Sequence, residues 1–451
     1  MAPEPETTAK RAELPMRLTR LRVKNFRSIA DIDIPLSPLT VLVGPNGSGK
    51  SNVVDALRFV RDVFARGLDQ AVMDREGMGV IQRWGTEGVG FGFTFFSEST
   101  KPNNYLSVEH EGFRPMKPSF SIEYLFEIFE NKDKLIVVKK EELNIVAFEE
   151  NNLKIKIIRE GDLIKGRIGE RNWVQVETKA KSQTRSLTDN EHLLLPYVLF
   201  GYSYDLFKKI PGFYSDFSVI NFLEKISADI RNSVDFLLST SLYNLNSADL
   251  RQPQQTLRDN PFDEKGRNLA AVIRRLLRQG GASWDILIYA LHQAVAGFES
   301  VDVETIGGYL ATKLTYRTND NGPRTSYLGQ ESDGTIRMIG LLAALQQEPS
   351  QALISIEEPE ANIHPGALAV LAGVIEEASL RSQILVTTHS PDMLDHLPVE
   401  SFLVVEKIGD TTHVGPLNAS QIASVRKRLF TPGELFRMEG LQRQTKPESA
   451  S

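Results

Sequence analysis

The chain has 451 residues and a formal net charge of −6, with 41% hydrophobic and 24% charged residues, as in soluble globular proteins of one to three domains. It has no cysteine, which excludes disulfides, thiol catalysis and cysteine-ligated zinc. The acidic balance leaves no global electrostatic footprint for nucleic acid, and no apolar run approaches the roughly 20 residues of a membrane span.

The first 15 residues are polar and lack the apolar region of a secretory signal. We interpret residues 1–15 as a disordered lead-in, residues 441–451 as a disordered tail, and the cytoplasm as the default compartment. From Leu18 to Ile34, apolar and polar residues alternate around a break at Asn25–Arg27. This alternation predicts two strands that pair as a hairpin.

The stretch VLVGPNGSGKS, Val41 to Ser51, has the form G-x-x-x-x-G-K-S after an apolar strand and before a predicted helix. In such a loop the glycines let backbone N–H groups surround the phosphates of a nucleotide, at the positive end of the helix. We expect ATP as cofactor, with Lys50 reaching its β- and γ-phosphates and Ser51 binding Mg²⁺. The predicted nucleotide contacts are Gly44, Asn46, Gly47, Ser48, Gly49, Lys50, Ser51 and Asn52.

The order strand, N-F-R-S, strand and phosphate-binding loop resembles the start of the ABC-type heads of SMC, RecF and OLD proteins. That resemblance implies that Arg27 lies near the nucleotide; an exposed hairpin charge is the alternative. Arg58 takes the place of an arginine that senses nucleotide or DNA in these heads, or else lies on a solvated helix face. Gln82 is a candidate for the Q-loop glutamine that contacts Mg²⁺ and the γ-phosphate.

Residues 97–186 consist of alternating segments joined by short polar turns, which predict an antiparallel β-rich insert. Lys132 to Arg185 holds 13 Lys or Arg and 9 Asp or Glu, a local excess of four positive charges (13 − 9). This excess is consistent with a solvated sheet face or with a surface for nucleic acid or a partner.

Residues 187–300 carry helical spacing without sustained heptads, so a compact helical insertion takes the place of the coiled-coil arm of SMC proteins. The segment FDEKGRNLAAVIRRL, together with the predicted helix and strand after it, resembles compact stand-alone ATPases of the RecF/OLD type, which are counted among the AAA ATPases and are often encoded in mobile or phage-defence loci.

Ser332-Asp333-Gly334-Thr335 precedes an apolar helix and resembles the ABC signature in an S-D-G-T form. Exposed N–H groups at a helix N-terminus can bind a phosphate. In the family this loop contacts the γ-phosphate held by a second subunit. An ordinary helix cap is the alternative for Ser332, Asp333 and Gly334.

ALISIEEPEANIHP resembles a Walker B segment, since the buried-strand pattern of residues 352–356 ends in Glu357 and Glu358. Glu357 would support Mg²⁺, and Glu358 would polarise the attacking water. Glu357 replaces the aspartate that is usual in ABC ATPases. Residues 361–364 take the place of the D-loop. In ILVTTHSPDML, His389 follows a strand and takes the place of the switch histidine, which reports the γ-phosphate.

These motifs predict an α/β fold, an ABC-type P-loop NTPase head with an antiparallel β lobe and an inserted β-rich plus helical subdomain. The head would comprise residues 16–96 and 301–440, interrupted by the insert 97–186 and the helical insertion 187–300. OLD proteins carry a TOPRIM nuclease after the head, whereas about 60 residues follow His389 here, so we expect no such domain in this sequence.

The resemblance implies an ATPase that forms a head-to-tail homodimer or higher oligomer around two ATP molecules. We predict a DNA-associated or anti-phage defence process with a separate effector protein, and possible DNA binding. The alternatives are an ATP-gated sensor or scaffold that sequesters a partner protein, and a RecF-like DNA repair ATPase. The motor subunit of a membrane transporter fits poorly, because transporter heads lack the long insertion.

Overall fold

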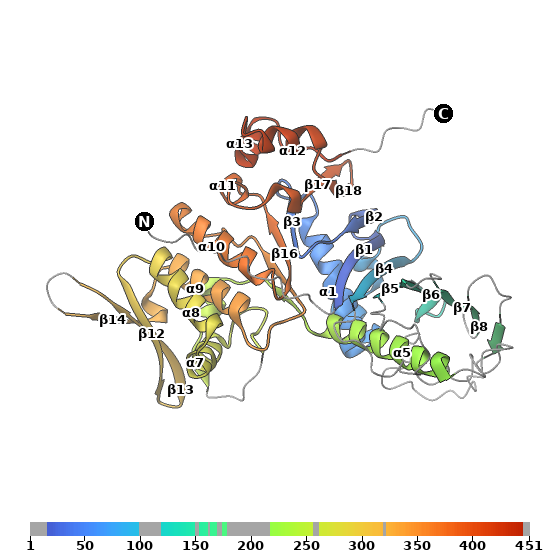
Figure 1. Ribbon diagram of the computed structural model, residues 1–451, viewed down its shortest axis with the longest axis horizontal. Coiled ribbons are helices and arrows are strands. Elements are labelled where there is room, and N and C mark those ends of the chain that lie inside the picture. Colours follow the sequence, from blue (N-terminus) through green and yellow to red (C-terminus); the bar gives the residue numbers. More distant parts are fainter. Residues whose placement is uncertain are drawn as a thin grey trace, which may run out of the picture.

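The computed structural model describes residues 16–98, 119–148, 153–160, 163–168, 174–177, 217–255, 261–318 and 322–444. The expected lead-in 1–15 and most of the expected tail lie outside these ranges, as does a large part of the expected inserts. Within the described ranges, one 14-stranded sheet runs through the molecule in the order β10-β15-β16-β3-β17-β18-β2-β1-β4-β5-β6-β7-β8-β9 (Figure 1).

The strands at one end of this sheet are parallel, and three of them carry the predicted phosphate-binding loop, Walker B segment and histidine segment at their ends. These strands are β10 (Thr240–Tyr243), β15 (Leu353–Glu357), β16 (Gln383–Thr388), β3 (Leu39–Val43) and β17 (Phe402–Ile408). All residues of β3, β10 and β16 are buried, because other elements cover both faces of these strands.

The remaining strands pair mainly as antiparallel neighbours, and together they form the predicted β lobe. The hairpin of β1 and β2 confirms the alternation from Leu18 to Ile34, and β5 continues the sheet directly from β4. The strands are β1 (Met16–Phe26), β2 (Ile29–Pro35), β4 (Val89–Glu98), β5 (Ser119–Glu130), β6 (Ile136–Phe148), β7 (Leu153–Glu160), β8 (Leu163–Ile168), β9 (Val174–Glu177) and β18 (Thr411–Pro416).

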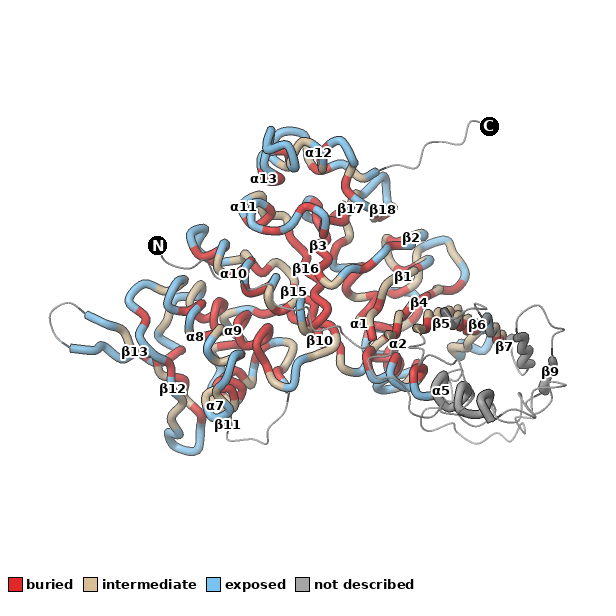
Figure 2. The backbone as a smooth tube through the Cα atoms, in the orientation of Figure 1, coloured by how far each residue is buried: buried red, intermediate tan, exposed pale blue. Residues whose placement is uncertain are grey.

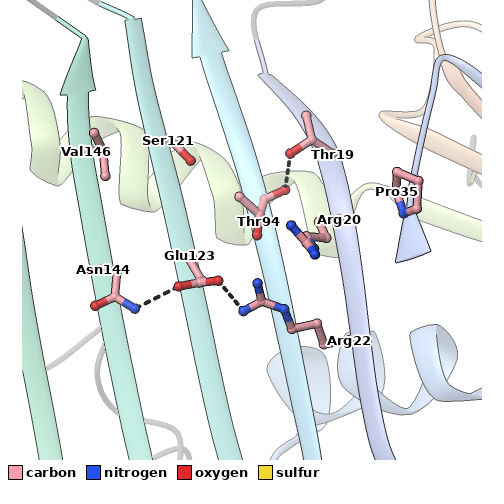
Figure 3. Close-up of a pocket in the computed structure, with 9 residues that line it drawn as sticks. All are labelled: Thr19, Arg20, Arg22, Pro35, Thr94, Ser121, Glu123, Asn144 and Val146. Carbon is pink, nitrogen blue, oxygen red and sulfur yellow. Dashed lines mark hydrogen bonds and ion pairs between the residues drawn. The ribbon is translucent and has the colours of Figure 1, made fainter. Parts of the chain in front are cut away.

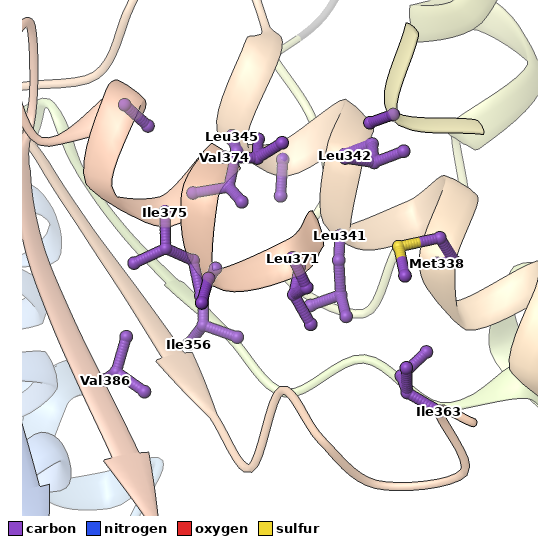
Figure 4. Close-up of a cluster of buried hydrophobic side chains, with 14 of the residues drawn as sticks. Met338, Leu341, Leu342, Leu345, Ile356, Ile363, Leu371, Val374, Ile375 and Val386 are labelled. Atoms are coloured by element: carbon purple, nitrogen blue, oxygen red, sulfur yellow. The ribbon is translucent and has the colours of Figure 1, made fainter. Parts of the chain in front are cut away.

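Helices cover both faces of the parallel strands, because alternate strand residues point into two separate hydrophobic clusters. Leu42 and Leu385 belong to the cluster of α1 (Lys50–Arg66), whereas Val41 and Val386 belong to that of α9 (Asp333–Gln346). The second cluster includes side chains of α10 (Pro365–Ala378), as Figure 4 shows, and Figure 2 marks the buried stretches of the central strands in red. Each fully buried leucine or isoleucine contributes roughly 1.5–3 kcal/mol, so these clusters fix the strand ends that carry the motifs.

Shorter elements connect these layers. Both α2 (Leu68–Met73) and α5 (Phe217–Leu238) contact α1, and the end of α3 (Met78–Ile81) lies against the β1–β2 turn, where Arg27 N donates to Ile81 O. On the other side a small sheet projects from the molecule (Figure 1). Its neighbourhood comprises α6 (Ser247–Leu250), β11 (Gln254–Gln255), α7 (Leu269–Gln279), α8 (Ala282–Ala294), β12 (Phe298–Ile306), β13 (Tyr309–Tyr316) and β14 (Arg324–Tyr327). At the C-terminal side, α11 (Pro391–Leu394) packs on α13 (Pro432–Met438), which follows α12 (Ala419–Arg426).

The strand β10 lies inside the range in which the sequence predicted only helices. Its four residues, Thr240–Tyr243, are all buried and pair with β15, from Thr240↔Leu353 to Tyr243↔Ile356. A run this short carries no periodicity, and its pairing partner lies more than 100 residues further along the chain. The range 187–300 therefore contributes a strand to the central sheet as well as helices.

Candidate functional site

The loop after β3 is shaped by glycines that stand where a side chain has no room. A Cβ at Gly44 would lie 2.2 Å from the carbonyl oxygen of Val405, and one at Gly49 would lie 2.1 Å from Thr412 Oγ1. Gly49 also has a φ of 106°, a conformation that L side chains rarely adopt. Gly47, at φ 76°, faces open space. The loop is therefore held from behind by β17 and β18 and is open on its outer side.

Lys50 is buried and folded back over this loop. Its Nζ donates hydrogen bonds to the carbonyl oxygens of Gly44, at 2.7 Å, and Pro45, at 3.0 Å. Burial lowers the pKa of Lys50, and the nearby carboxylates of Glu358 and Glu360 oppose that shift. A buried ammonium whose partners are mostly neutral carbonyls is suited to exchange them for an anion.

The N-terminus of α1 has no side-chain cap and no acidic residue in its first turn. Ser48 Oγ is buried and has no hydrogen-bond partner among the described residues. Free N–H groups, an unpaired hydroxyl and a lysine around an open loop match the donor set that phosphate groups require. The residues present therefore fit a nucleotide phosphate, with Ser51 exposed in the first turn of α1.

The parallel strands β3, β15 and β16 bring the phosphate-binding loop, the paired glutamates and the histidine segment to one edge of the sheet. Register pairs Val43 at the end of β3 with Thr388 at the end of β16, and Thr387 with Glu357 at the end of β15. Ligand sites in open α/β sheets form at this carboxyl edge. The phosphate-binding loop, the paired glutamates and the histidine segment thus leave the sheet side by side.

Glu358 occupies a sharp turn directly after β15. Its φ is 47°, and its backbone N–H donates to Thr387 O at 2.9 Å. The side chain is 42% exposed and directed to His389, whose Nδ1 lies 3.2 Å from Glu358 Oε1 without hydrogen-bond geometry. Glu357 is largely buried, and its Oε1 lies 3.8 Å from Arg58 Nη2.

Glu360 also reaches this group, although the sequence analysis did not select it. Its Oε1 accepts a hydrogen bond from Thr388 Oγ1 at 2.6 Å and a longer one from His389 N at 3.4 Å. Its Oε2 is buried without a partner among the described residues. The signal was present as the repeated carboxylate in E-E-P-E, two residues after Glu358.

The predicted signature loop caps α9. Ser332 Oγ accepts from Thr335 N at 3.2 Å, and a Cβ at Gly334 would lie 2.5 Å from Asn362 O. The loop therefore packs on the segment that takes the place of the D-loop. Arg337, one turn further along α9, is buried and donates to the carbonyl oxygens of Glu357, at 3.3 Å, and Glu358, at 2.6 Å. Sequence reasoning missed this link between α9 and the paired glutamates.

Arg27 and Arg58 belong to a network of ion pairs around Asp55 on α1. Arg27 Nη2 lies 2.9 Å from Asp55 Oδ2, and Arg58 Nη1 lies 3.9 Å from Asp55 Oδ1. On its other side Arg58 approaches Glu357 and Glu264. Neither arginine is thus a simple exposed charge, and the chain Arg27–Asp55–Arg58–Glu357 connects the β1–β2 turn to the end of β15.

Asn52 and Gln82 lie at the base of the same region. Asn52 Nδ2 donates to Ser28 Oγ at 2.6 Å, and Ser28 Oγ lies 2.7 Å from Thr412 Oγ1. Gln82 forms an isolated bridge with Phe26, and its side-chain amide donates to Thr86 O. Asn46 is exposed at the loop tip. In this structure Gln82 is engaged in its own loop rather than with the predicted metal residues.

A magnesium ion is compatible with Ser51 and Glu357, since Mg²⁺ in nucleotide sites takes one or two protein ligands and fills the rest with water and phosphate oxygens. Within the described ranges, no group of three or more His, Cys, Asp or Glu side chains is arranged to hold a metal by itself. The donor set therefore fits a nucleotide-bound Mg²⁺ better than a resident metal.

A separate groove of about 460 Å³ lies on the β lobe, where Arg20, Arg22, Glu123 and Asn144 line it (Figure 3). Its charges are mutually paired, because Arg20 binds Asp33 and Arg22 binds Glu123. Nearby on β6, Glu142 is paired with Lys140 and Lys156; burial alone would raise the pKa of Glu142, but hydrogen bonds from Lys156 and Asn144 lower it. The described lysines of the insert are thus partly neutralised.

The fold and this edge of the sheet define a P-loop α/β protein of the ATPase class. The chain matches the family model described as "AAA ATPase domain" over residues 16–279, more than half its length, and it belongs to that family. Residues 176–395 match a second AAA domain model, whose description refers to the AbiEii toxin and type IV toxin–antitoxin systems.

Curated relatives match over short stretches. The chain is 58% identical over 43 residues to the OLD nuclease of Thermus scotoductus, which covers 10% of this chain and 8% of the relative. It is 57% identical over 47 residues to the chromosome partition protein Smc of Halothermothrix orenii, covering 10% and 4%. It is 43% identical over 58 residues to the DNA replication and repair protein RecF of Brucella abortus, covering 13% and 15%. The predicted resemblance to the RecF, SMC and OLD group is confirmed, although the matches span only a small part of each relative.

Among solved structures, the Smc head bound to the C-winged helix domain of ScpA has a TM-score of 0.44 at 15% identity, covering 90% of this chain and 99% of that chain. The SMC head domain from Thermotoga maritima has a TM-score of 0.37 at 14% identity, covering 89% and 100%. In the part of the chain that the structure describes, none of the helices is both long enough and apolar enough to cross a membrane.

Proposed function

We propose that this protein hydrolyses ATP in composite sites between two copies of the chain. The observation that carries the proposal is the convergence of Lys50, Glu358 and His389 at the ends of three neighbouring parallel strands. A phosphate-binding lysine, an exposed carboxylate and an imidazole in one place are the groups that phosphoryl transfer to water requires.

In the proposed reaction, the N–H groups of the loop hold the phosphates while Lys50 turns from the carbonyls of Gly44 and Pro45 toward them. Glu358 orients the attacking water and accepts its proton, and His389 donates a hydrogen bond to the γ-phosphate. Mg²⁺, held through Ser51 and Glu357, would neutralise the charge that develops on the phosphates. The metal role of Gln82 and the nucleotide contacts of Asn46, Asn52 and Arg27 remain part of this proposal.

The signature loop supports the proposal of a second copy. Among the described residues, no hydrogen bond or ion pair joins Ser332–Thr335 to the loop 44–51 of the same chain. The exposed helix N-terminus at Ser332 is therefore available for the γ-phosphate of an ATP bound by a partner copy. If the signature loop of each chain contacts the ATP held by the other, the result is a symmetric dimer in which both chains use the same surface.

For the output, we propose that dimer closure drives a DNA-associated or anti-phage defence process through a separate effector protein in the cytoplasm. The short match to an OLD nuclease and the toxin–antitoxin family description support this direction. The match to RecF favours a DNA repair ATPase as the second candidate. An ATP-gated scaffold that sequesters a partner protein would share the same site but turn over slowly.

The test compares the wild type with Glu358→Gln, each with and without duplex DNA, by ATP turnover and by light-scattering mass in ATP. We expect Glu358→Gln to lower turnover by at least about 100-fold and to retain an ATP-dependent dimer, because the isosteric amide cannot accept the proton. Glu299→Gln, which removes an exposed carboxylate on β12, is the matched control.

If turnover persists in Glu358→Gln and mass does not depend on ATP, the composite site is wrong. If duplex DNA raises wild-type turnover, the DNA-associated process is supported. If the dimer forms and DNA has no effect, a protein effector or partner is the better assignment.

A further inference from the structure

The signature loop of this chain carries a negative charge at the place where it is proposed to meet a phosphate. Asp333 is the first residue of α9 and directly follows the cap Ser332. Its side chain is 55% exposed. An ionised carboxylate beside the N–H groups of Ser332–Thr335 would repel an approaching triphosphate, so the loop can accept one only if this charge is compensated.

Arg251, the residue that follows α6, compensates it. Its Nη2 lies 2.6 Å from Asp333 Oδ1 and also donates to Glu331 O at 2.8 Å, while Nη1 donates to Gly329 O at 2.8 Å. Hydrogen bonds from Arg251 and from Ser247 lower the pKa of Asp333, which keeps this carboxylate ionised. One guanidinium thus contacts Asp333 in the loop and two carbonyl oxygens of the segment just before it, and it pairs with the acidic side chain of Ser332–Thr335.

The position of Arg251 is fixed by packing. The preceding Leu250 is 3% exposed, and its methyl carbons lie where a Cβ at Gly340 would come within 3.0 Å. Because Gly340 belongs to α9, the end of α6 is anchored on the same helix that the signature loop begins. The packing of α6 on α9 therefore fixes the position of Arg251 relative to the loop.

We propose that Arg251 is a positioning residue of the composite ATPase site: it neutralises Asp333 and holds the S-D-G-T loop so that the loop can receive the γ-phosphate of an ATP bound to a second copy of the chain. This proposal rests on the composite site proposed above. With an uncharged residue at position 333, the loop would need no compensating cation, and with Asp333 it needs Arg251. The guanidinium has five N–H donors, so it can keep its loop contacts and still face the incoming phosphate.

The first experiment tests whether removing both charges rescues the loss of one. It measures steady-state turnover, and it measures the affinity for ATP at protein concentrations low enough for the chain to be monomeric. We expect Arg251→Gln to lower kcat by about 10- to 100-fold, because the unpaired charge of Asp333 opposes closure of the dimer around ATP. The affinity of the monomeric chain for ATP should stay unchanged. Asp333→Asn combined with Arg251→Gln should recover most of that loss.

Arg267→Gln is the matched control, because Arg267 is a nearby, half-exposed arginine that pairs with Asp249 instead. It should turn over ATP like the wild type. If the double variant is as slow as Arg251→Gln, charge compensation is wrong. If Arg251→Gln turns over ATP like the wild type while the wild type still dimerises in ATP, Arg251 has no role in the site.

The second experiment tests whether Arg251 acts on the ATP bound by its own chain or on the ATP bound by the partner copy. Lys50→Ala subunits alone are expected to be inactive, and Arg251→Gln subunits alone should keep only a turnover reduced about 10- to 100-fold. Mixing the two equally should raise turnover to roughly a quarter of the wild-type rate, because half of the dimers are mixed and each contains one intact site. No recovery would place Arg251 in its own subunit's site and overturn the proposal. A wild type without ATP-dependent dimers would instead refute the proposed function itself.

Discussion

At the scale of single residues, the carboxylate of Glu360 links the end of β16 to the histidine that follows it. Its Oε1 accepts from Thr388 Oγ1 and from the backbone N–H of His389, and it lies 3.9 Å from His389 Nδ1. Because the side chain of Glu360 is nearly buried, its hydrogen bonds hold Thr388 and the backbone of His389 in place. Glu360 is therefore a positioning residue for His389 in the proposed site.

We predict that Glu360→Gln lowers ATP turnover by roughly 10-fold while leaving ATP-dependent dimerisation intact, because the amide keeps the shape but loses the charge facing the imidazole. The measurements are steady-state turnover and light-scattering mass in ATP. Glu299→Gln serves as the control for the loss of one carboxylate. Turnover equal to that of the wild type would mean that Glu360 supports the fold alone.

The sequence predicted Lys50, Glu357, Glu358 and His389 as site residues, because each follows an apolar strand at a recognisable motif spacing, and the structure brings the ends of these strands together. The sequence was not sufficient for Glu360, Arg337 and Arg251. The inward direction of Glu360 depends on the left-handed turn at Glu358, and the other two act on backbone carbonyls of distant segments. The contacts of Arg337 and Arg251 leave no local pattern of residue types, and the only local signal for Glu360 is the repeated carboxylate of E-E-P-E.

At the scale of elements, the phosphate-binding loop is held in shape by strands that come last in the chain. Thr412 on β18 lies against Gly49 and donates to Ser48 O at 2.9 Å, and Val405 on β17 lies against Gly44. The loop motif was evident in the sequence. Its support by β17 and β18 was not, because these strands lie more than 350 residues away from it.

We predict that Gly49→Ala destabilises the protein by about 2–4 kcal/mol, since a Cβ there combines a positive φ with a clash against Thr412. Gly47→Ala should cost only about 1 kcal/mol, because its Cβ would project into open space and only the backbone conformation is disfavoured. Thermal unfolding without nucleotide measures both. Equal losses in the two variants would contradict the role of β18.

At the scale of the whole molecule, the proposed site unites parts of the chain that lie far apart in sequence. The loop after β3, the end of β15 and the end of β16 belong to one continuous sheet with helices on both faces. The sequence predicted the α/β class and the antiparallel lobe, and both are confirmed. It could not predict β10, because four residues gain strand structure only from their pairing with β15.

A ligand bound at that shared edge should therefore stabilise the sheet as one unit. We predict that ATP at 100 times its Kd adds about 2.7 kcal/mol to the stability of Glu358→Gln and raises its Tm by a few degrees in a single transition. Differential scanning calorimetry with and without ATP checks this, and Lys50→Ala should abolish the shift. A rise confined to one of two separate transitions would show that the halves unfold independently.

Two arginines of α1 also affect the edge of the sheet, because β10 is one of its two end strands within the described residues. Arg58 donates to Leu242 O, Arg61 donates to Thr240 O, and Glu264 accepts from Leu242 N. Side chains thus occupy the hydrogen-bonding groups that an edge strand would otherwise offer to a foreign chain. Over Thr240–Leu242 the sheet is protected against strand addition and against the aggregation that such addition causes.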